Sequence, residues 1–424
     1  MHVQTDVLVI GAGISGLVAA LAAKTSGCSV SVATNGAGTV AISTGCIDLL
    51  GCVGQETVTD PWDAMKKLPE EHPYSLLGRE KIQTALAGFT EVLARQKMPY
   101  ASAEDGKNLF LPTILGTMKP SYLVPEALDA RPLTKARTIL VCGVEGLRDL
   151  SPKLCRDQLK RQAALAQTRI TAAMLPSPFP HTHRGITALD LARHVNTDEG
   201  LTWLETSLGR FAKAFDVVLL PPILGTSRNA ELLTHFKELL SAHVEEMLSI
   251  PPGVGGIRLR EALSREATQQ GVRFLENVNI QKAQCQSGHC VSVETDGIDP
   301  LRITAKSFVL ATGGILGGGI RTTPFEAVEP LFHLEISPAL EKVRNEPDVR
   351  KAKDLLTSLG VTVGHDLRPK DAAGACFLDN VFLAGRILGG YDFAREKSGH
   401  GVAIATGWTA GTLAADLFGR ETKS

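Results

Sequence analysis

Apolar runs and helical spacing alternate over the first thirty-four residues in the order of a β-α-β unit. Asp6–Ile10 is an apolar run bounded by Gly11, which predicts a buried parallel strand. Ile14–Ser26 places apolar residues at helical spacing, and Gly27 after it is a typical helix stop. Ser29–Ala33 predicts a second strand. This amino-terminal segment is therefore predicted to begin a nucleotide-binding sheet.

Residues from about 60 to 250 follow a different pattern, with frequent Pro and Gly between alternating elements. The strands predicted here are Thr138–Cys142, Arg169–Leu175 and Asp216–Leu220. The helices predicted between them are Lys153–Gln167, Leu201–Phe215 and Arg228–His243. We interpret residues 61–250 as an α/β domain for a substrate or a partner, inserted into a domain formed by residues 1–60 and 251–424.

The first pattern resumes after Gly255 with a helix predicted over Ile257–Gln270. The strands predicted after this helix are Val272–Phe274, Ile280–Ala283, Cys290–Thr295, Leu301–Thr304 and Ser307–Ala311. This order is expected of a doubly wound nucleotide domain with a small antiparallel insert. The predicted fold class is α/β, with Rossmann-like dinucleotide-binding topology and an inserted α/β domain.

The segment Gly11-x-Gly13-x-x-Gly16 lies between the first predicted strand and the first predicted helix, with Ser15 inside it. Glycines at this spacing permit a tight turn, a close approach of backbone to a phosphate, and close helix–strand packing. The helix N-terminus then offers unpaired N–H groups and a positive dipole to the phosphate. Because the motif has this context, it favours dinucleotide or flavin binding over a merely structural turn.

The end of the second strand departs from the usual dinucleotide fingerprint. An Asp or Glu normally follows there and binds a ribose hydroxyl. This chain has Thr34 and Asn35 instead, followed by Gly36. Two alternatives are open: Asn35 or another residue replaces the acid, or the cofactor has no AMP ribose, as in FMN.

Two later segments match strand ends of flavoproteins. Ala311-Thr312-Gly313 ends an apolar strand, where small residues are needed next to a cofactor. The second segment begins after the strand at Val381, and a helix follows it whose N-terminus would face the flavin. Its predicted flavin-binding residues are Gly385, Arg386, Gly389, Gly390, Gly399, His400 and Gly401.

Two details of these flavin-binding segments leave questions open. Many flavoproteins have an Asp, which binds the ribityl chain, at the position of Arg386. Ser43-Thr44-Gly45 lies where flavoproteins of the succinate dehydrogenase type pass small residues over the flavin. The alternative for Ser43, Thr44 and Gly45 is a plain loop.

Composition narrows the functional classes. Lys plus Arg is 44 and Asp plus Glu is 45, so the formal net charge of −1 argues against a nucleic-acid-binding protein. The eight cysteines form no C-x-x-C pair, and their spacing matches no zinc or iron–sulfur site, so no metal is predicted. The uncharged stretch over residues 7–23 is shorter than the ~20 residues of a membrane span.

Several segments resemble the B-type subunit of bacterial anaerobic glycerol-3-phosphate dehydrogenase. The segments that carry this resemblance are His72–Gly78, Leu115–Thr117, Gly256–Leu259, Leu367–Pro369 and Ile387–Asp392. The resemblance extends from residue 1 to about residue 415, and the missing acid after the second strand is similar to the family pattern.

The resemblance implies an enzyme that oxidises sn-glycerol 3-phosphate to dihydroxyacetone phosphate during anaerobic growth. It implies FMN as the cofactor, with FAD as the alternative. It also implies two partners. One is a flavin-bearing A-type subunit, and the other is an iron–sulfur C-type subunit that anchors the complex to the membrane and passes electrons to quinone. The chain would then be cytoplasmic and peripheral on the inner face of the cell membrane.

A phosphate-bearing substrate calls for Arg side chains or a helix N-terminus. Arg258 and Arg368 are therefore substrate candidates, with His72 and Tyr74 as further polar contacts. The alternatives are a helix-start ion pair for Arg258, a loop role for His72 and a contact through the backbone only for His400. No catalytic base is assigned.

Two alternative functions remain open at this point. The chain would serve in electron transfer and assembly if the A-type subunit oxidises the substrate. It would be a stand-alone flavin-dependent oxidoreductase if it assembles with neither partner.

Overall fold

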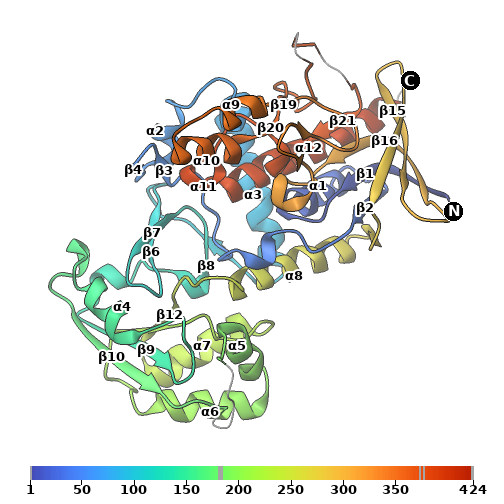
Figure 1. Cartoon of the computed structure of the whole chain (residues 1–424). Coiled ribbons are helices and arrows are strands. Elements are labelled where there is room, and N and C mark those ends of the chain that lie inside the picture. Colours follow the sequence, from blue (N-terminus) through green and yellow to red (C-terminus); the bar gives the residue numbers. More distant parts are fainter. Residues whose placement is uncertain (1, 180–184, 372–373, 376–377, 422–424) are drawn as a thin grey trace. The chain divides into compact units, whose positions relative to one another are not determined.

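The computed structural model describes residues 2–179, 185–371, 374–375 and 378–421. The chain forms two compact units, which are described separately. The first unit comprises residues 1–39, 48–96 and 262–424, and the second comprises residues 40–47 and 97–261. Figure 1 shows their elements coloured along the sequence.

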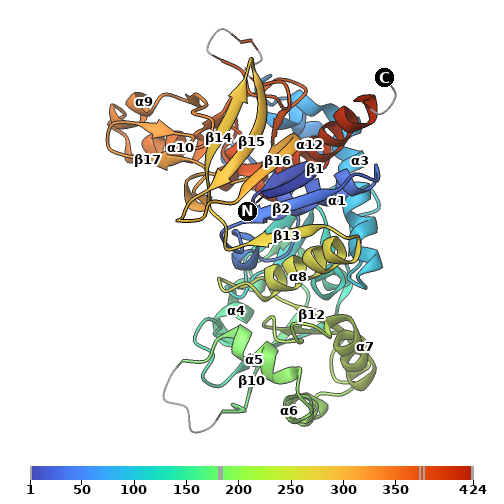
Figure 2. The same ribbon diagram turned by 90° about the vertical axis from the view of Figure 1, so that its right-hand side faces the viewer.

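The first unit contains a seven-stranded sheet in the order β13-β2-β1-β16-β15-β14, with β21 also paired to β16. Its strands are β1 (His2–Ile10), β2 (Val30–Thr34), β13 (Arg273–Glu276), β14 (Ile280–Gln286), β15 (His289–Thr295), β16 (Arg302–Leu310) and β21 (Val381–Leu383). β1, β2, β13, β16 and β21 are parallel, and β14 and β15 add an antiparallel hairpin, visible in Figure 2. The central parallel strands are largely buried, which explains their continuous apolar runs.

Three helices pack on this sheet or on each other: α1 (Ile14–Lys24), α3 (Pro73–Arg95) and α12 (Gly399–Glu421). α1 and α12 approach so closely that a Cβ on Gly411 would lie 2.1 Å from the carbonyl oxygen of Ala19. The other helices of this unit are α2 (Pro61–Met65), α9 (Leu340–Arg344), α10 (Val349–Ser358) and α11 (Phe393–Glu396). Its short strands are β3 (Cys52–Val53), β4 (Glu56–Thr57), β17 (Arg321–Thr322), β18 (Ala327–Val328), β19 (Ile336–Ser337) and β20 (Gly360–Val361).

The second unit is built on a parallel sheet in the order β10-β9-β11-β12. Its main elements are β9 (Thr138–Val144), α4 (Pro152–Leu159), β10 (Arg169–Leu175), α5 (Ala188–Val195), α6 (Asp198–Gly209), β11 (Val217–Leu220), α7 (Asn229–Leu240) and β12 (His243–Glu246). Its short strands are β5 (Tyr100–Ala101), β6 (Leu109–Pro112), β7 (Met118–Ser121) and β8 (Val124–Pro125). Apolar residues of this sheet and its helices form one core cluster.

The structure confirms the predicted fold class, a flavoprotein-type α/β fold with an inserted α/β unit. The unit boundaries differ from the predicted domain limits in three places, of which one is residues 251–261, which belong to the second unit. Residues 61–96 belong to the first unit because α3 packs against α12, and residues 40–47 belong to the second. The continuous helix α8 (Val254–Gln269) runs across the later boundary.

Candidate functional site

The turn between β1 and α1 is shaped by its glycines. Gly11 has a φ of 112°, and a Cβ there would lie 2.3 Å from the carbonyl oxygen of Ala311. A Cβ on Gly16 would lie 1.9 Å from the carbonyl oxygen of Gly11. Gly13 is different, since a Cβ there would have no heavy atom within 4 Å. Gly11 and Gly16 therefore close the turn, and Gly13 borders open space.

Gly13 is also the N-cap of α1 and provides no side-chain hydrogen bond to the helix. The first N–H groups of a helix have no partner within the helix, and its positive dipole end favours an anion. Open space in front of such a helix end fits a phosphate group of a cofactor. Ser15, in the first turn of α1, is buried.

The residues that follow β16 form a second wall of this site. The N–H of Ala311 donates to the carbonyl oxygen of Ile10 at 2.9 Å, which aligns the ends of β16 and β1. Thr312 comes next, and its Oγ1 atom is buried without a hydrogen-bond partner among the described residues. A buried hydroxyl left unpaired costs free energy, and a polar group of a ligand would satisfy it. Thr312 therefore fits a polar cofactor.

The end of β2 has no acidic side chain. Thr34 Oγ1 donates to the carbonyl oxygen of Gly36 at 2.6 Å and accepts from the Gly36 N–H at 3.2 Å, so its hydroxyl is used within the loop. The side chain of Asn35 is exposed. A Cβ on Gly38 would lie 3.0 Å from Gly13 Cα, so this loop reaches the turn. The replacement of the missing acid by Asn35 stays a prediction.

β21 brings a third segment to the start of α1. Gly385 has a φ of 77°, its N–H donates to Thr406 Oγ1 at 2.9 Å, and a Cβ there would lie 2.4 Å from Ser15 Oγ. The N-terminus of α12 follows, where the Gly401 N–H donates to the carbonyl oxygen of Asp48 at 3.1 Å. The structure therefore places the predicted residues Gly11–Gly16 and Gly385 next to each other.

The side chain of Arg386 has a different environment from the one predicted. Its guanidinium donates to the carbonyl oxygens of Thr357 and Leu359 at the C-terminal end of α10. It also lies over the rings of Phe393 and Tyr391, at 4.5 Å and 5.7 Å from their centroids. Burial lowers the pKa of Arg386. The Arg386 side chain thus stabilises the C-terminal end of α10. A contact between Arg386 and a flavin stays a prediction, now for the backbone of Arg386 alone.

His72 and Tyr74 are engaged in the structure of the first unit. His72 Nδ1 accepts the N–H of Tyr74 at 3.0 Å and caps α3, so its Nε2 carries the proton that it donates to Glu396 at 3.1 Å. Tyr74 Oη donates to the carbonyl oxygen of Leu49 at 2.6 Å, and burial raises its pKa well above 10. These contacts support the structural alternative for His72.

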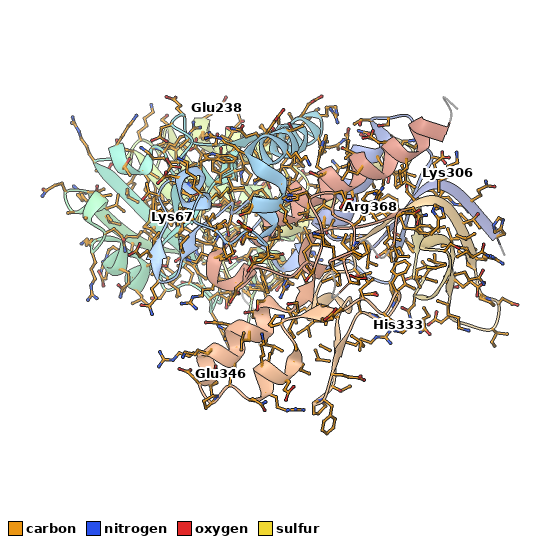
Figure 3. All side chains as sticks on the ribbon, turned by 90° about the horizontal axis from the view of Figure 1, so that it is seen from above. Lys67, Glu238, Lys306, His333, Glu346 and Arg368 are labelled. Carbon is orange, nitrogen blue, oxygen red and sulfur yellow. The ribbon has the colours of Figure 1, made fainter. Side chains whose placement is uncertain are left out.

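The two candidate arginines differ. Arg258 is buried in the second unit, where Nη1 pairs with Glu246 at 2.5 Å and Nε donates to the carbonyl oxygen of Gly225 at 2.8 Å. Its charge is therefore compensated inside the protein, as the ion-pair alternative expects. Arg368, labelled in Figure 3, belongs to the first unit. Its Nη1 atom lies 3.4 Å from Asp366 Oδ2, and its buried Nε has no partner among the described residues. Arg368 keeps a donor for a ligand.

The Arg258–Glu246 pair borders a small pocket within the second unit. Apolar side chains such as Met98 and Leu128 dominate its lining, together with Thr44. Ser43 and Gly45 belong to the same unit and form a local turn, in which Ser43 Oγ accepts the Gly45 N–H at 3.3 Å. Their predicted contact with a flavin stays a prediction.

Sequence reasoning missed Tyr391. Its side chain is buried, its Oη has no hydrogen-bond partner in the described part of the chain, and burial raises its pKa to about 12. Its ring lies 5.8 Å from that of His72. The signal in the sequence was its position directly after Gly389 and Gly390, at the start of the segment that leads to α12.

The described residues contain no group of His, Cys, Asp or Glu side chains arranged to hold a metal ion. Within the same residues, every helix is too short or too polar to cross a membrane.

Comparisons with known proteins indicate the family of this chain. Residues 6–402 match the family model described as FAD binding domain. A probable B-type subunit of anaerobic glycerol-3-phosphate dehydrogenase from Halobacterium salinarum is 31% identical, over 99% of this chain and 100% of that one. The B-type subunit of anaerobic glycerol-3-phosphate dehydrogenase from Vibrio cholerae is 29% identical, over 96% of this chain and 95% of that one.

Among solved structures, 3-ketosteroid delta1-dehydrogenase from Sterolibacterium denitrificans is similar, with a TM-score of 0.46 and 13% identity. The similarity covers 99% of this chain and 100% of that one.

Proposed function

This chain belongs to the family of B-type subunits of anaerobic glycerol-3-phosphate dehydrogenase, and from this premise we propose that it is the flavin-binding subunit of a quinone-linked enzyme. The enzyme would oxidise sn-glycerol 3-phosphate to dihydroxyacetone phosphate. The observation that carries the proposal is the open space at Gly13, at the N-terminus of α1. The substrate is proposed because the relatives of this chain are named for glycerol 3-phosphate.

We propose FAD as the cofactor, in place of the FMN predicted from the missing acid. The family model is described as an FAD binding domain, so it indicates FAD more directly than FMN. Gly13, Thr312 and Gly385 would line the cofactor, and Asn35 would take the place of the acid at the ribose. A bound flavin would supply the acceptor for a hydride from the secondary alcohol carbon of the substrate.

Arg368 is the candidate for binding the substrate phosphate. Its guanidinium charge faces one partly exposed acid, Asp366, and its buried Nε is unpaired among the described residues, whereas Arg258 is neutralised by Glu246. Arginine suits this role because its fork of N–H groups matches the oxygens of a phosphate.

The relatives are named as one of several lettered subunits, which supports a complex of several different chains. The proposed partners are a flavin-bearing A-type subunit and an iron–sulfur C-type subunit. In this proposal, the iron–sulfur partner attaches the chain to the inner face of the cell membrane.

A second candidate function is electron transfer, with the substrate oxidised by the flavin-bearing A-type partner. The polar groups of His72, Tyr74 and Arg258 all have partners within the protein, which leaves none of the three as an evident contact for a substrate. This observation favours a chain that accepts electrons and binds no substrate of its own.

An anaerobic reduction experiment separates these candidates. The purified chain with its bound flavin is mixed with glycerol 3-phosphate, and the visible flavin absorbance is followed. Bleaching with glycerol 3-phosphate, weakened in Arg368→Gln and unchanged in the exposed control Arg350→Gln, supports substrate oxidation on this chain. Bleaching only after the A-type partner is added supports the electron-transfer role, and an absence of bleaching with all partners present contradicts both.

A further inference from the structure

Two cysteines face each other across the β14–β15 hairpin of the first unit. Cys285 in β14 and Cys290 in β15 are direct register partners, next to the pair Gln286–His289 that closes the hairpin (Figure 2). The turn residues Ser287 and Gly288 both have positive φ values, 50° and 80°, as a tight two-residue hairpin turn requires. The backbone therefore fixes this pairing locally.

The spacing of this pair suits a covalent bond. Directly opposite residues of an antiparallel pair have Cα atoms about 4.5 or 5.5 Å apart. Both values lie in the range of about 4.4–6.8 Å that a disulfide spans. As directly opposite residues of an antiparallel pair, the two side chains lie on the same face of the hairpin. Among the described cysteines that lie in strands, these two alone are register partners of each other.

We propose that Cys285 and Cys290 form a reversible oxidation site, which closes to an intrachain disulfide when the chain meets an oxidant of the small-molecule disulfide class. Cys285 is exposed and Cys290 is buried. The Cys285 sulfur attacks one sulfur of the oxidant, forms a mixed disulfide and releases one small thiol. The Cys290 sulfur then attacks Cys285 Sγ, forms the internal bond and releases the second small thiol. The two protein thiols lose two electrons and two protons, which the oxidant receives.

The surroundings of Cys290 hold it in place for the second step. Its N–H donates to Asn380 Oδ1 at 2.8 Å, and Asn380 Nδ2 donates back to the Cys290 carbonyl oxygen at 2.8 Å. Asn380 directly precedes β21, whose end leads to Gly385. These contacts involve the Cys290 backbone, and the Cys290 thiol itself donates to the carbonyl oxygen of Ser292 at 3.8 Å, a weak contact that the second step breaks. Burial raises the pKa of both thiols, so little of either is thiolate at neutral pH and the exchange is expected to be slow.

Peptide mapping tests the proposal on the full-length chain. The chain is treated with oxidised glutathione, blocked with an alkylating reagent and digested with trypsin, and the peptide of residues 283–302 is weighed. Cys376, which lies outside the described residues, is replaced by Ser in all samples so that it does not compete. The expected peptide is lighter by two hydrogens, carries no alkyl group, and returns to two alkylated cysteines after reduction with dithiothreitol.

Three variants sharpen this test. Cys290→Ser is expected to keep glutathione on Cys285, because the resolving thiol is gone, and Cys285→Ser is expected to give no adduct at the buried Cys290. The matched control Cys52→Ser, at a half-buried cysteine of β3, is expected to form the internal bond as the parent does. A parent peptide with two alkylated cysteines, or with glutathione retained on Cys285, would overturn the proposal. The peptide mass of the parent chain decides the test by itself, so the proposal is still tested if one of the variants fails to fold.

Discussion

The β1–α1 turn of the first unit and the start of α8 in the second unit are both rich in glycine, but they use it differently. A Cβ on Gly13 would meet no atom within 4 Å. At the start of α8, a Cβ on Gly253 would lie 1.8 Å from the carbonyl oxygen of Ser43, and one on Gly255 would lie 2.1 Å from that of Thr44. Glycine spacing alone therefore does not mark a ligand site; at Gly13 the open space also lies in front of a helix N-terminus, which suits an anion.

The polar groups of the two regions show the same contrast. Thr312 Oγ1, beside the β1–α1 turn, is buried without a partner among the described residues, whereas Arg258 and Glu246 in the second unit satisfy one another. The start of α1 thus combines open space with an unpaired hydroxyl, whereas the start of α8 combines close backbone contacts with a paired arginine and glutamate beside its pocket. Four variants test this contrast, and we take them from the largest expected effect to the smallest.

Glu246→Ala is expected to lower the free energy of unfolding of the second unit by about 3–5 kcal/mol, because it leaves Arg258 buried without its counter-charge. Denaturant unfolding measures the change when it is followed by tryptophan fluorescence in a chain that keeps Trp203, packed on the core of this unit, and has Trp62 and Trp408 replaced by Phe. Glu238→Ala, at an exposed position of α7, is the control and is expected to change it little. If the two variants prove equally stable, the second region is not held together by this ion pair.

Gly16→Ala is expected to lower the free energy of unfolding by about 1–3 kcal/mol and to remove the flavin, since its Cβ would overlap the Gly11 carbonyl oxygen. Thermal unfolding and the flavin absorbance of the purified protein measure the two effects. Gly36→Ala, at a position where a Cβ would meet no atom within 4 Å, is the control for stability. A stable Gly16→Ala chain with full flavin content would show that the turn tolerates a side chain.

Gly13→Ala is expected to change the free energy of unfolding by less than about 0.5 kcal/mol, because its Cβ meets no atom of the protein. Its affinity for the flavin is expected to fall about tenfold, or about 1.4 kcal/mol, because the methyl group occupies the open space. Titration of the flavin-free chain with FAD measures the affinity. If Gly13→Ala binds FAD with the affinity of the parent, the flavin does not bind beside Gly13.

Asp6→Asn is expected to have the smallest effect. Burial raises the pKa of Asp6, but hydrogen bonds from Ser29 and the charge of Lys306 outweigh it, so the pKa lies below 3.8. The carboxylate therefore stabilises the fold above pH 3.8, and this contribution is lost as the pH falls through the lowered pKa. Because the group is partly exposed and its ion pair is screened by solvent, we expect a loss of about 0.2–1 kcal/mol at neutral pH.

A pH series of thermal unfolding measures this effect. Asp6→Asn and the parent are expected to converge in acid, and the exposed control Asp299→Asn should follow the parent at every pH. A constant difference between Asp6→Asn and the parent at all pH values would mean that packing, and not charge, is responsible.

Local patterns predicted much of the fold. The β1–α1–β2 unit and strands β9, β10 and β11 lie where apolar runs and helical spacing placed them. The start of the second unit did not follow from local pattern, because α3 joins the first unit through contacts with α12, more than three hundred residues later. The turn glycines Gly11, Gly13 and Gly16 were predictable because their spacing, between a strand and a helix, is visible in the sequence itself.

The side-chain candidates were less predictable, because their partners are distant in sequence. His72 is paired with Glu396, 324 residues away, and Arg258 binds the carbonyl oxygen of Gly225, 33 residues away. The spacing of these residues along the chain does not predict such partners. Tyr391 was overlooked for the same reason, since only the fold shows that its hydroxyl is buried and unpaired among the described residues.

The central claim is that this chain binds FAD at the β1–α1 turn. The most direct measurement releases the cofactor from the purified chain and identifies it by mass spectrometry, with Gly13→Ala purified alongside. The account predicts FAD in the parent chain and a reduced FAD content in Gly13→Ala. FMN in the parent, or a parent chain that binds no flavin after incubation with FAD, would contradict it.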